Sequence, residues 1–181
     1  EQFVQIAPIL LTVLGLGLIG AFGEELGWRG FLLPKMMSGG FKSPYLVCGL
    51  VWASWHLPLI AFGDFYQTSN PLLMTLVYGL GIIAMSFVFS ELRVRSGSVW
   101  IAVIAHAAHN FFFQFAVPVL LLTAPGSHSE LWDIVAGDTG VCIAVLYCVM
   151  HPVLRRILRR HSARENRDGI YPFVSTDAAS W

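Results

Sequence analysis

Long segments without Asp, Glu, Lys or Arg constrain most strongly how this chain can fold. A helix needs about 20 mostly apolar residues to cross a bilayer. Four segments meet that need, and a fifth is weaker because it contains Asp133 and Asp138: residues 3–23, 43–63, 71–90, 96–122 and 131–154. The sequence therefore predicts an all-α fold, a polytopic transmembrane helix bundle with about five spans.

The composition excludes an ordinary soluble domain. Hydrophobic residues make up 56% of the 181 residues and charged residues only 12%, whereas soluble domains have about 25% charged residues. Membrane lipid is therefore the expected surrounding of residues 1–156. Residues 157–181 are expected to form a basic, disordered cytoplasmic tail, whose arginines suit anionic headgroups better than nucleic acid. No nucleic-acid partner is expected.

Basic residues alternate between the connections of the predicted spans. The first connection has Arg29, Lys35 and Lys42, the third has Arg93 and Arg95, and the segment after the last span is rich in arginine. The second and fourth connections, residues 64–70 and 123–130, have no Lys or Arg. Because such residues favour the cytoplasmic side, we expect a multi-pass protein of a bacterial cell membrane, with a cytoplasmic tail.

Ionisable residues within membrane spans are costly and are therefore functional candidates. The first group is Glu24, Glu25 and Arg29. Glu25 and Arg29 are four residues apart and can form an ion pair on one helix face. Glu24 is rotated by about 100° from Glu25 and can face a cavity as a general base. The alternative is that these charges only mark the edge of the membrane.

The other two groups lie inside predicted spans. His56 follows Trp52 by four residues and precedes Pro58, and His106 precedes Asn110 by four residues on one helix face. Hydrogen bonding between helices is the alternative reading of each. On a helix that rises 1.5 Å per residue, both histidines and Glu24 would lie roughly 12–20 Å from the cytoplasmic side. A shared depth predicts one cavity that opens toward the cytoplasm.

Together these groups resemble the CAAX protease and bacteriocin-processing family, also called type II CAAX prenyl endopeptidases. The family pattern is Glu-Glu-x-x-x-Arg, Phe-x-x-x-His and His-x-x-x-Asn or Asp, each on a membrane helix. Here it is matched by Glu24, Glu25 and Arg29, then by Trp52 and His56, and then by His106 and Asn110, with Trp in place of Phe. Family members usually have further spans before the Glu-Glu helix, so the resemblance implies that these spans are part of a larger bundle.

The resemblance implies an intramembrane endopeptidase that cleaves membrane-associated peptides or prenylated CAAX-type C-termini. Glu24 and His56 would activate a water molecule, His106 and Asn110 would stabilise the oxyanion, and Glu25 and Arg29 would support the site. We favour a site without metal or cofactor, because the chain has no His-Glu-x-x-His motif. The alternative is a zinc site with Glu24, His56 and His106 as ligands.

Two other functions are compatible with buried polar residues. One is a non-catalytic membrane scaffold or immunity protein of the same family, in which the polar cluster only joins helices. The other is a small transporter or proton relay, since buried Glu and His also serve there. The absence of an inverted sequence repeat disfavours the transporter, and the completeness of all three motifs favours the protease.

Overall fold

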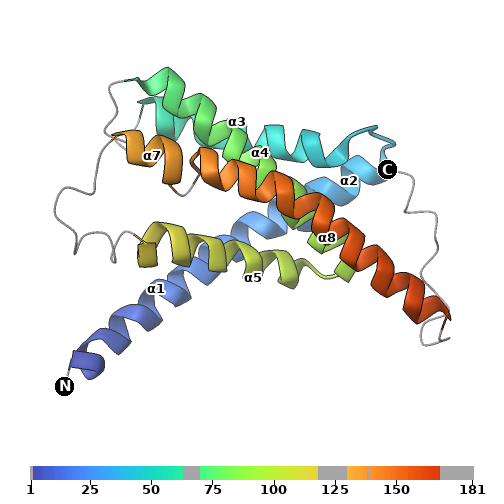
Figure 1. The fold of residues 1–181 in the computed structure, drawn as a ribbon, viewed down its shortest axis with the longest axis horizontal. Coiled ribbons are helices and arrows are strands. Elements are labelled where there is room, and N and C mark those ends of the chain that lie inside the picture. The colour runs from blue at the N-terminus through green and yellow to red at the C-terminus, as the bar shows by residue number, and fades with distance from the viewer. Residues whose placement is uncertain (1, 63–69, 118–129, 138, 168–181) are drawn as a thin grey trace.

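A computed structural model describes residues 2–62, 70–117, 130–137 and 139–167, which are almost entirely helical and contain no strand (Figure 1). The all-α prediction is therefore confirmed. Most of the second and fourth predicted connections, Asp138 and the end of the predicted tail, residues 168–181, lie outside the described residues.

The described helices follow one another with short connections. Helix α1 continues without interruption into a π-helical segment, η1, and then into α2. Helix α5 likewise continues into a second π-helical segment, η2. In order, the elements are α1 (Gln2–Glu25), η1 (Leu26–Leu32), α2 (Leu33–Ser38), α3 (Pro44–Phe62), α4 (Pro71–Ser96), α5 (Val99–Asn110), η2 (Phe111–Ala116), α7 (Glu130–Ala136) and α8 (Val141–Arg167).

Four described segments are long and apolar enough to cross a membrane: Leu10–Ser38, Pro71–Ser96, Val99–Ala116 and Ile134–Arg160. The helix Pro44–Ile60 is equally apolar but shorter. These segments correspond to the spans predicted from the sequence, and the chain is an integral membrane protein.

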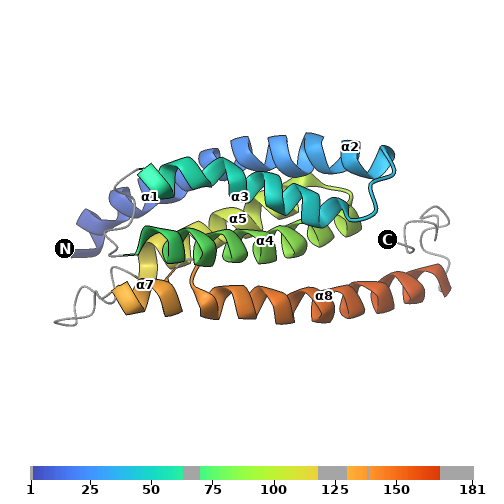
Figure 2. The ribbon, with the colours of Figure 1, turned by 90° about the horizontal axis from the view of Figure 1, so that it is seen from above.

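Helix α4 is the centre of the bundle. It packs against α3, α5, α8 and η1, and Figure 2 shows it between α3 and α8. Gly49 of α3 permits a close approach to α4, because a Cβ atom placed there would lie 3.0 Å from Ser86 Cβ and 3.3 Å from Ile83 Cα. At its end α4 stops at Gly97, whose φ of 67° is the left-handed conformation that favours glycine.

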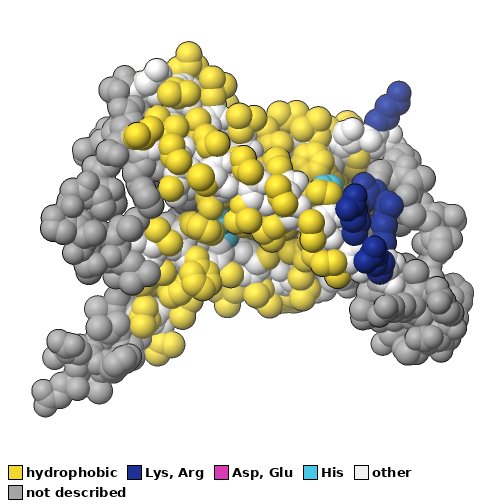
Figure 3. Space-filling view, viewed as in Figure 1, with side chains coloured by type: hydrophobic (Ala, Val, Ile, Leu, Met, Phe, Trp, Pro, Cys, Tyr) yellow, Lys and Arg dark blue, Asp and Glu magenta, His cyan; other side chains and the backbone are white. Residues whose placement is uncertain are grey.

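The outer surface is apolar, as expected for a protein whose solvent is lipid. Large hydrophobic side chains such as Leu80, Trp100 and Val149 are more than half exposed. On the face in Figure 3, the Lys and Arg side chains gather at one end of this apolar surface. That end is where α8 reaches its arginine-rich turns.

The last span differs from its prediction over residues 131–154. Helix α7 ends at Ala136, and α8 begins at Val141 and continues to Arg167. The first part of the expected tail, residues 157–167, is therefore helical. Arginine is a good helix former, so the helix continues beyond the point where the apolar segment ends.

The expected positions of several basic residues also need a correction. Arg29 was counted among the basic residues of the first connection, but it lies in η1 and is fully buried. Lys35 and Lys42 are both exposed, but Lys35 lies in the last turn of α2, so only Lys42 lies in the connection itself. Arg93 and Arg95 likewise belong to the last turns of α4 and not to a loop.

Candidate active site

Glu25 and Arg29 form a fully buried ion pair at the junction of α1 and η1. Arg29 Nη1 donates to Glu25 Oε1 at 2.8 Å, as their four-residue spacing predicted. The guanidinium also lies over two aromatic rings, with its central carbon 4.3 Å from the centre of the Trp52 ring and 5.4 Å from that of Phe89. Such cation–π contacts stabilise a desolvated cation, so the pair joins α1 to α3 and α4.

The same carboxylate holds His106 of α5. His106 Nδ1 lies 2.9 Å from Glu25 Oε1. Because a carboxylate accepts, Nδ1 carries the proton, and Nε2 is the remaining nitrogen of a ring that is only 3% exposed. Glu25 thus fixes both the orientation of His106 and the position of Arg29.

Glu24 points to a different partner, as its rotation from Glu25 predicted. Its Oε2 accepts a hydrogen bond from Trp52 Nε1 at 2.8 Å. Trp52 is 1% exposed, so this donor is fixed by packing. Hydrogen bonds to an ionised carboxylate are about twice as strong as neutral ones, and this one orients the Glu24 carboxylate.

His56 lies one turn after Trp52 on α3. Its Nδ1 is 3.0 Å from the carbonyl oxygen of Trp52. A carbonyl can only accept, so Nδ1 donates, and Nε2 of the neutral ring keeps a lone pair. This local hydrogen bond selects the tautomer in which Nε2 can act as an acceptor or base.

A cavity of about 40 Å³ brings the predicted residues of all three motifs together. Glu24, His56, His106 and Asn110 all line it, although they come from α1, α3 and α5. Such a volume can hold a water molecule when several polar groups surround it. The remaining lining residues are Trp52, Tyr78, Ile82, Met85, His109, Gln114 and Thr139.

His109 differs from its neighbour Asn110 because His109 has a hydrogen-bond partner on another helix. The Tyr147 hydroxyl of α8 lies 3.1 Å from His109 Nδ1. His109 therefore leans toward α8. The ring of His109 still forms part of the cavity wall.

Sequence reasoning missed two features of this site. It treated Trp52 only as an aromatic residue, although its position one turn before His56 already placed it on the same helix face. It also gave no sign of Tyr147, since nothing near that residue in the sequence indicates a contact with α5. Both contacts depend on how distant helices pack.

Glu25 and Asn110 each stand immediately before a π-helical segment. Glu25 is the last residue of α1 before η1, and Asn110 is the last residue of α5 before η2. π-helical turns are rare and occur frequently at functional sites. Neither segment was predicted, because neither has a distinctive sequence signature.

The proposed zinc ligands do not assemble as a metal site in the described part of the chain. No group of three His, Cys, Asp or Glu side chains there is close enough to hold an ion. We therefore derive no chemical step through a metal.

The chain matches the model of a known protein family. The family described as "Type II CAAX prenyl endopeptidase Rce1-like" matches residues 6–112, which include all three motifs. The chain belongs to this family. The resemblance inferred from Glu24–Arg29, Trp52–His56 and His106–Asn110 is thereby confirmed as a family assignment.

One curated member of the CAAX endopeptidases is named CAAX prenyl protease 2 and comes from Methanococcus maripaludis. It is 33% identical to this chain over 106 residues, which are 55% of this chain and 39% of the relative. The match thus spans about two fifths of that relative's length. No solved structure matches the chain.

Proposed function

We propose that this chain forms the catalytic part of an intramembrane endopeptidase. The observation that carries the proposal is the convergence of Glu24, His56, His106 and Asn110 on one small cavity inside a membrane protein. Polar groups at this depth are expensive. Four of them around a cavity for water fit hydrolysis better than simple helix packing.

In the proposed reaction, a water molecule in the cavity attacks the carbonyl carbon of the scissile peptide bond. Glu24 takes a proton from the water, and His56 Nε2 orients the water through a hydrogen bond. The carbonyl oxygen becomes an oxyanion. When the tetrahedral intermediate collapses, the C–N bond breaks and Glu24 returns its proton to the leaving amine.

His106 and Asn110 are the proposed oxyanion donors. Asn110 would donate through its side-chain amide. His106 would donate from Nε2 when its ring carries both protons, with Nδ1 still bonded to Glu25. Donors that are fixed before the reaction stabilise the transition state without reorganisation, and Glu25 supplies that fixation for His106.

We propose membrane-associated peptides as the substrate class, with prenylated CAAX-type C-termini as the leading candidate. The name of the relative supports this choice. The apolar surface of the chain also suits substrates that are themselves held in the bilayer. We place the site open to the cytoplasm of a bacterial cell membrane, because the basic residues mark that side.

The decisive experiment measures the initial cleavage rate of a prenylated CAAX peptide by purified protein, per amount of folded protein. Glu24→Gln keeps the shape but removes the base, and we expect a loss of about 10²-fold or more. Glu91→Gln is the matched control, since Glu91 is a second buried carboxylate outside the cavity. Equal rates for Glu24→Gln and the unchanged protein would refute the assignment. Absence of cleavage by the unchanged protein would favour the scaffold alternative.

The proposed oxyanion role is tested by two neighbouring residues. Asn110→Ala should lower the cleavage rate by about 10² to 10³, because one oxyanion donor is lost. His109→Ala should have a much smaller effect, since its hydrogen bond to Tyr147 is structural. A severe loss in His109→Ala together with a normal rate in Asn110→Ala would contradict the role of Asn110.

Metal dependence is tested by elemental analysis and chelation of the same preparation. A glutamate-type site predicts less than stoichiometric zinc in active protein and unchanged cleavage with strong chelators. One zinc per chain, with activity lost on chelation and restored by zinc, would instead support the ligand set of Glu24, His56 and His106.

A further inference from the structure

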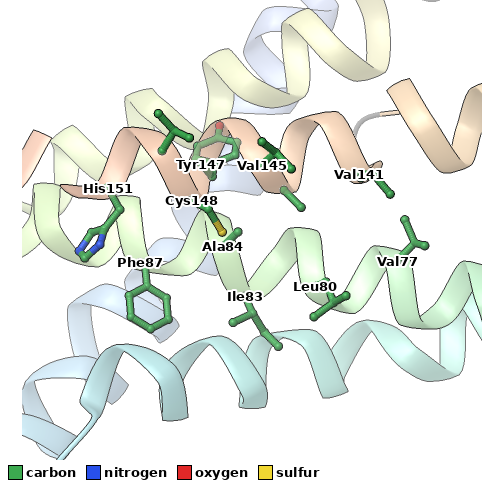
Figure 4. A pocket seen from close by; sticks show the side chains of 12 residues that line it. Val77, Leu80, Ile83, Ala84, Phe87, Val141, Val145, Tyr147, Cys148 and His151 are labelled. Carbon is green, nitrogen blue, oxygen red and sulfur yellow. The ribbon is translucent and has the colours of Figure 1, made fainter. Parts of the chain in front are cut away.

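A long apolar groove lies between α4 and α8 (Figure 4). Its volume is about 620 Å³, within the usual range for sites that hold small molecules. The lining is almost entirely aliphatic or aromatic and runs from Val77 and Val141 at one end to Phe87 and His151 at the other. The groove therefore suits a hydrocarbon chain.

This groove is separate from the candidate active site. It uses the face of α4 that carries Val77, Ala84 and Phe87, whereas the catalytic cavity uses the face with Tyr78 and Met85. Tyr147 stands between the two spaces. Its ring lines the groove, and its hydroxyl is hydrogen-bonded to His109 in the wall of the catalytic cavity.

One end of the groove is polar and cationic. A second cavity of about 190 Å³ adjoins it there and shares Phe87 and His151 with it. Lys42 and Arg155 line this second cavity, together with Ser43 and Tyr45. The combined space is thus an apolar channel that ends at two basic side chains.

Glu91 is a carboxylate close to this end, and its oxygens have partners. Glu91 Oε1 accepts from Arg95 Nε at 2.9 Å, and Oε2 accepts from the Tyr45 hydroxyl at 3.3 Å. His151 Nε2 lies 3.7 Å from the same Oε2. Arg95 thus offsets the charge of Glu91, and Lys42 and Arg155 are the two basic side chains that line this end.

The length of the groove matches one leaflet. Val141 and His151 are separated by ten residues of α8, or about 15 Å at 1.5 Å per residue. Half of a hydrocarbon core about 30 Å thick is the same distance. The cationic end lies at the cytoplasmic side predicted by the basic residues, where anionic lipids are enriched and basic pockets between helices bind their headgroups.

We propose that this groove binds one anionic phospholipid of the cytoplasmic leaflet. One acyl chain lies between α4 and α8, and the phosphate is held by Lys42 and Arg155. A prenyl chain of a substrate would also fit the apolar part, but the prenyl chain itself carries no anionic group for the two cations to hold. The lipid stabilises the packing of α8 on α4 and, through Tyr147, supports His109.

The test measures lipid bound to the full purified chain in neutral detergent by native mass spectrometry. Phosphatidylglycerol and phosphatidylcholine with identical acyl chains are offered at equal mole fractions. We expect phosphatidylglycerol to be retained with at least about tenfold preference. Each basic residue near an anionic surface is worth roughly a fivefold change, so Lys42→Gln and Arg155→Gln should each reduce that preference by about this factor.

Two further variants locate the site. Ala144→Trp places a large side chain in the groove and should abolish specific retention of phosphatidylglycerol, since Ala144 lines it. Lys35→Gln is the control, because Lys35 is an exposed cation of α2 that lines neither cavity. Equal retention of both lipids would overturn the proposal. So would unchanged retention in Ala144→Trp, or a loss in Lys35→Gln as large as that in Arg155→Gln.

Discussion

Replacing Arg29 with methionine should destabilise the protein far more than its single hydrogen bond suggests. The substitution keeps most of the side-chain volume but removes the cation. Glu25 would then remain fully buried without its ion-pair partner, since both side chains are 0% exposed. The consequence should be a large loss of folding free energy, and not only a loss of activity.

The magnitude follows from two contributions. Removing one partner of a buried ion pair costs about 3–5 kcal/mol. The guanidinium also lies over Trp52 and Phe89, and cation–π contacts contribute about 0.5–2 kcal/mol. We therefore expect Arg29→Met to lose about 3.5–7 kcal/mol in total. Adding Glu25→Gln to Arg29→Met should restore at least about 2 kcal/mol, because the double variant no longer buries an unpaired charge.

The three cysteines provide an assay. Cys48 is fully buried, whereas Cys142 and Cys148 are exposed. In a Cys142→Ser, Cys148→Ser background, a thiol-reactive fluorophore reacts only when unfolding exposes Cys48. Thermal and detergent-induced unfolding of the single and double variants then give the coupling between Glu25 and Arg29.

Additive effects of Glu25→Gln and Arg29→Met would refute this reasoning. Additivity would mean that each side chain stabilises the bundle separately, through packing alone. A folded Arg29→Met protein with unchanged stability would contradict it more directly. The matched comparison is Arg95→Met, since Arg95 also pairs with a buried glutamate but is itself 20% exposed, and its loss should cost less.

Three further predictions test packing, positioning and topology. Gly81→Ala should lower the unfolding temperature by several degrees, because its Cβ would lie 2.5 Å from the Thr139 carbonyl oxygen. Gly79→Ala on the same helix is the control, since its Cβ meets nothing within 4 Å and the unfolding temperature should not change. Equal effects of the two substitutions would contradict this packing. Trp52→Phe keeps an aromatic side chain but removes the N–H that donates to Glu24. The cleavage rate per amount of folded protein should therefore fall by about tenfold. A reporter inserted between α3 and α4 should lie outside the cell, and a reporter at the end of α8 should lie inside it. If both reporters lie on the same side, the predicted topology is wrong.

Much of the fold could be predicted from the sequence because membrane helices are local structures. A bilayer forces backbone groups to bond within their own segment, so apolar length alone located the spans. The same applies to Glu25 and Arg29, whose pairing needs only four-residue spacing within one helix. The rotation of Glu24 away from Glu25 was predictable for the same reason.

Contacts between helices were not predictable in this way. The partner of Glu24 is Trp52, and the partner of Glu25 on α5 is His106, which is 81 residues away in the sequence. The sequence predicted that these groups meet at one depth, but rotation about each helix axis decides which atoms bond. Glu91 was missed because α4 runs beyond the apolar segment to Ser96, so this carboxylate was read as part of a loop.

The π-helical segment after Glu25 has a consequence for insertions and deletions. A π turn closes each hydrogen bond over one residue more than an α turn, so η1 accommodates an extra residue within a continuous helix. Deleting one residue from Leu26–Leu32 should leave a regular α-helix in which α2 keeps nearly the same orientation relative to Glu24. The part of this helix before η1 and the part after it can therefore differ in register, and alignments of related sequences should tolerate a one-residue gap in η1.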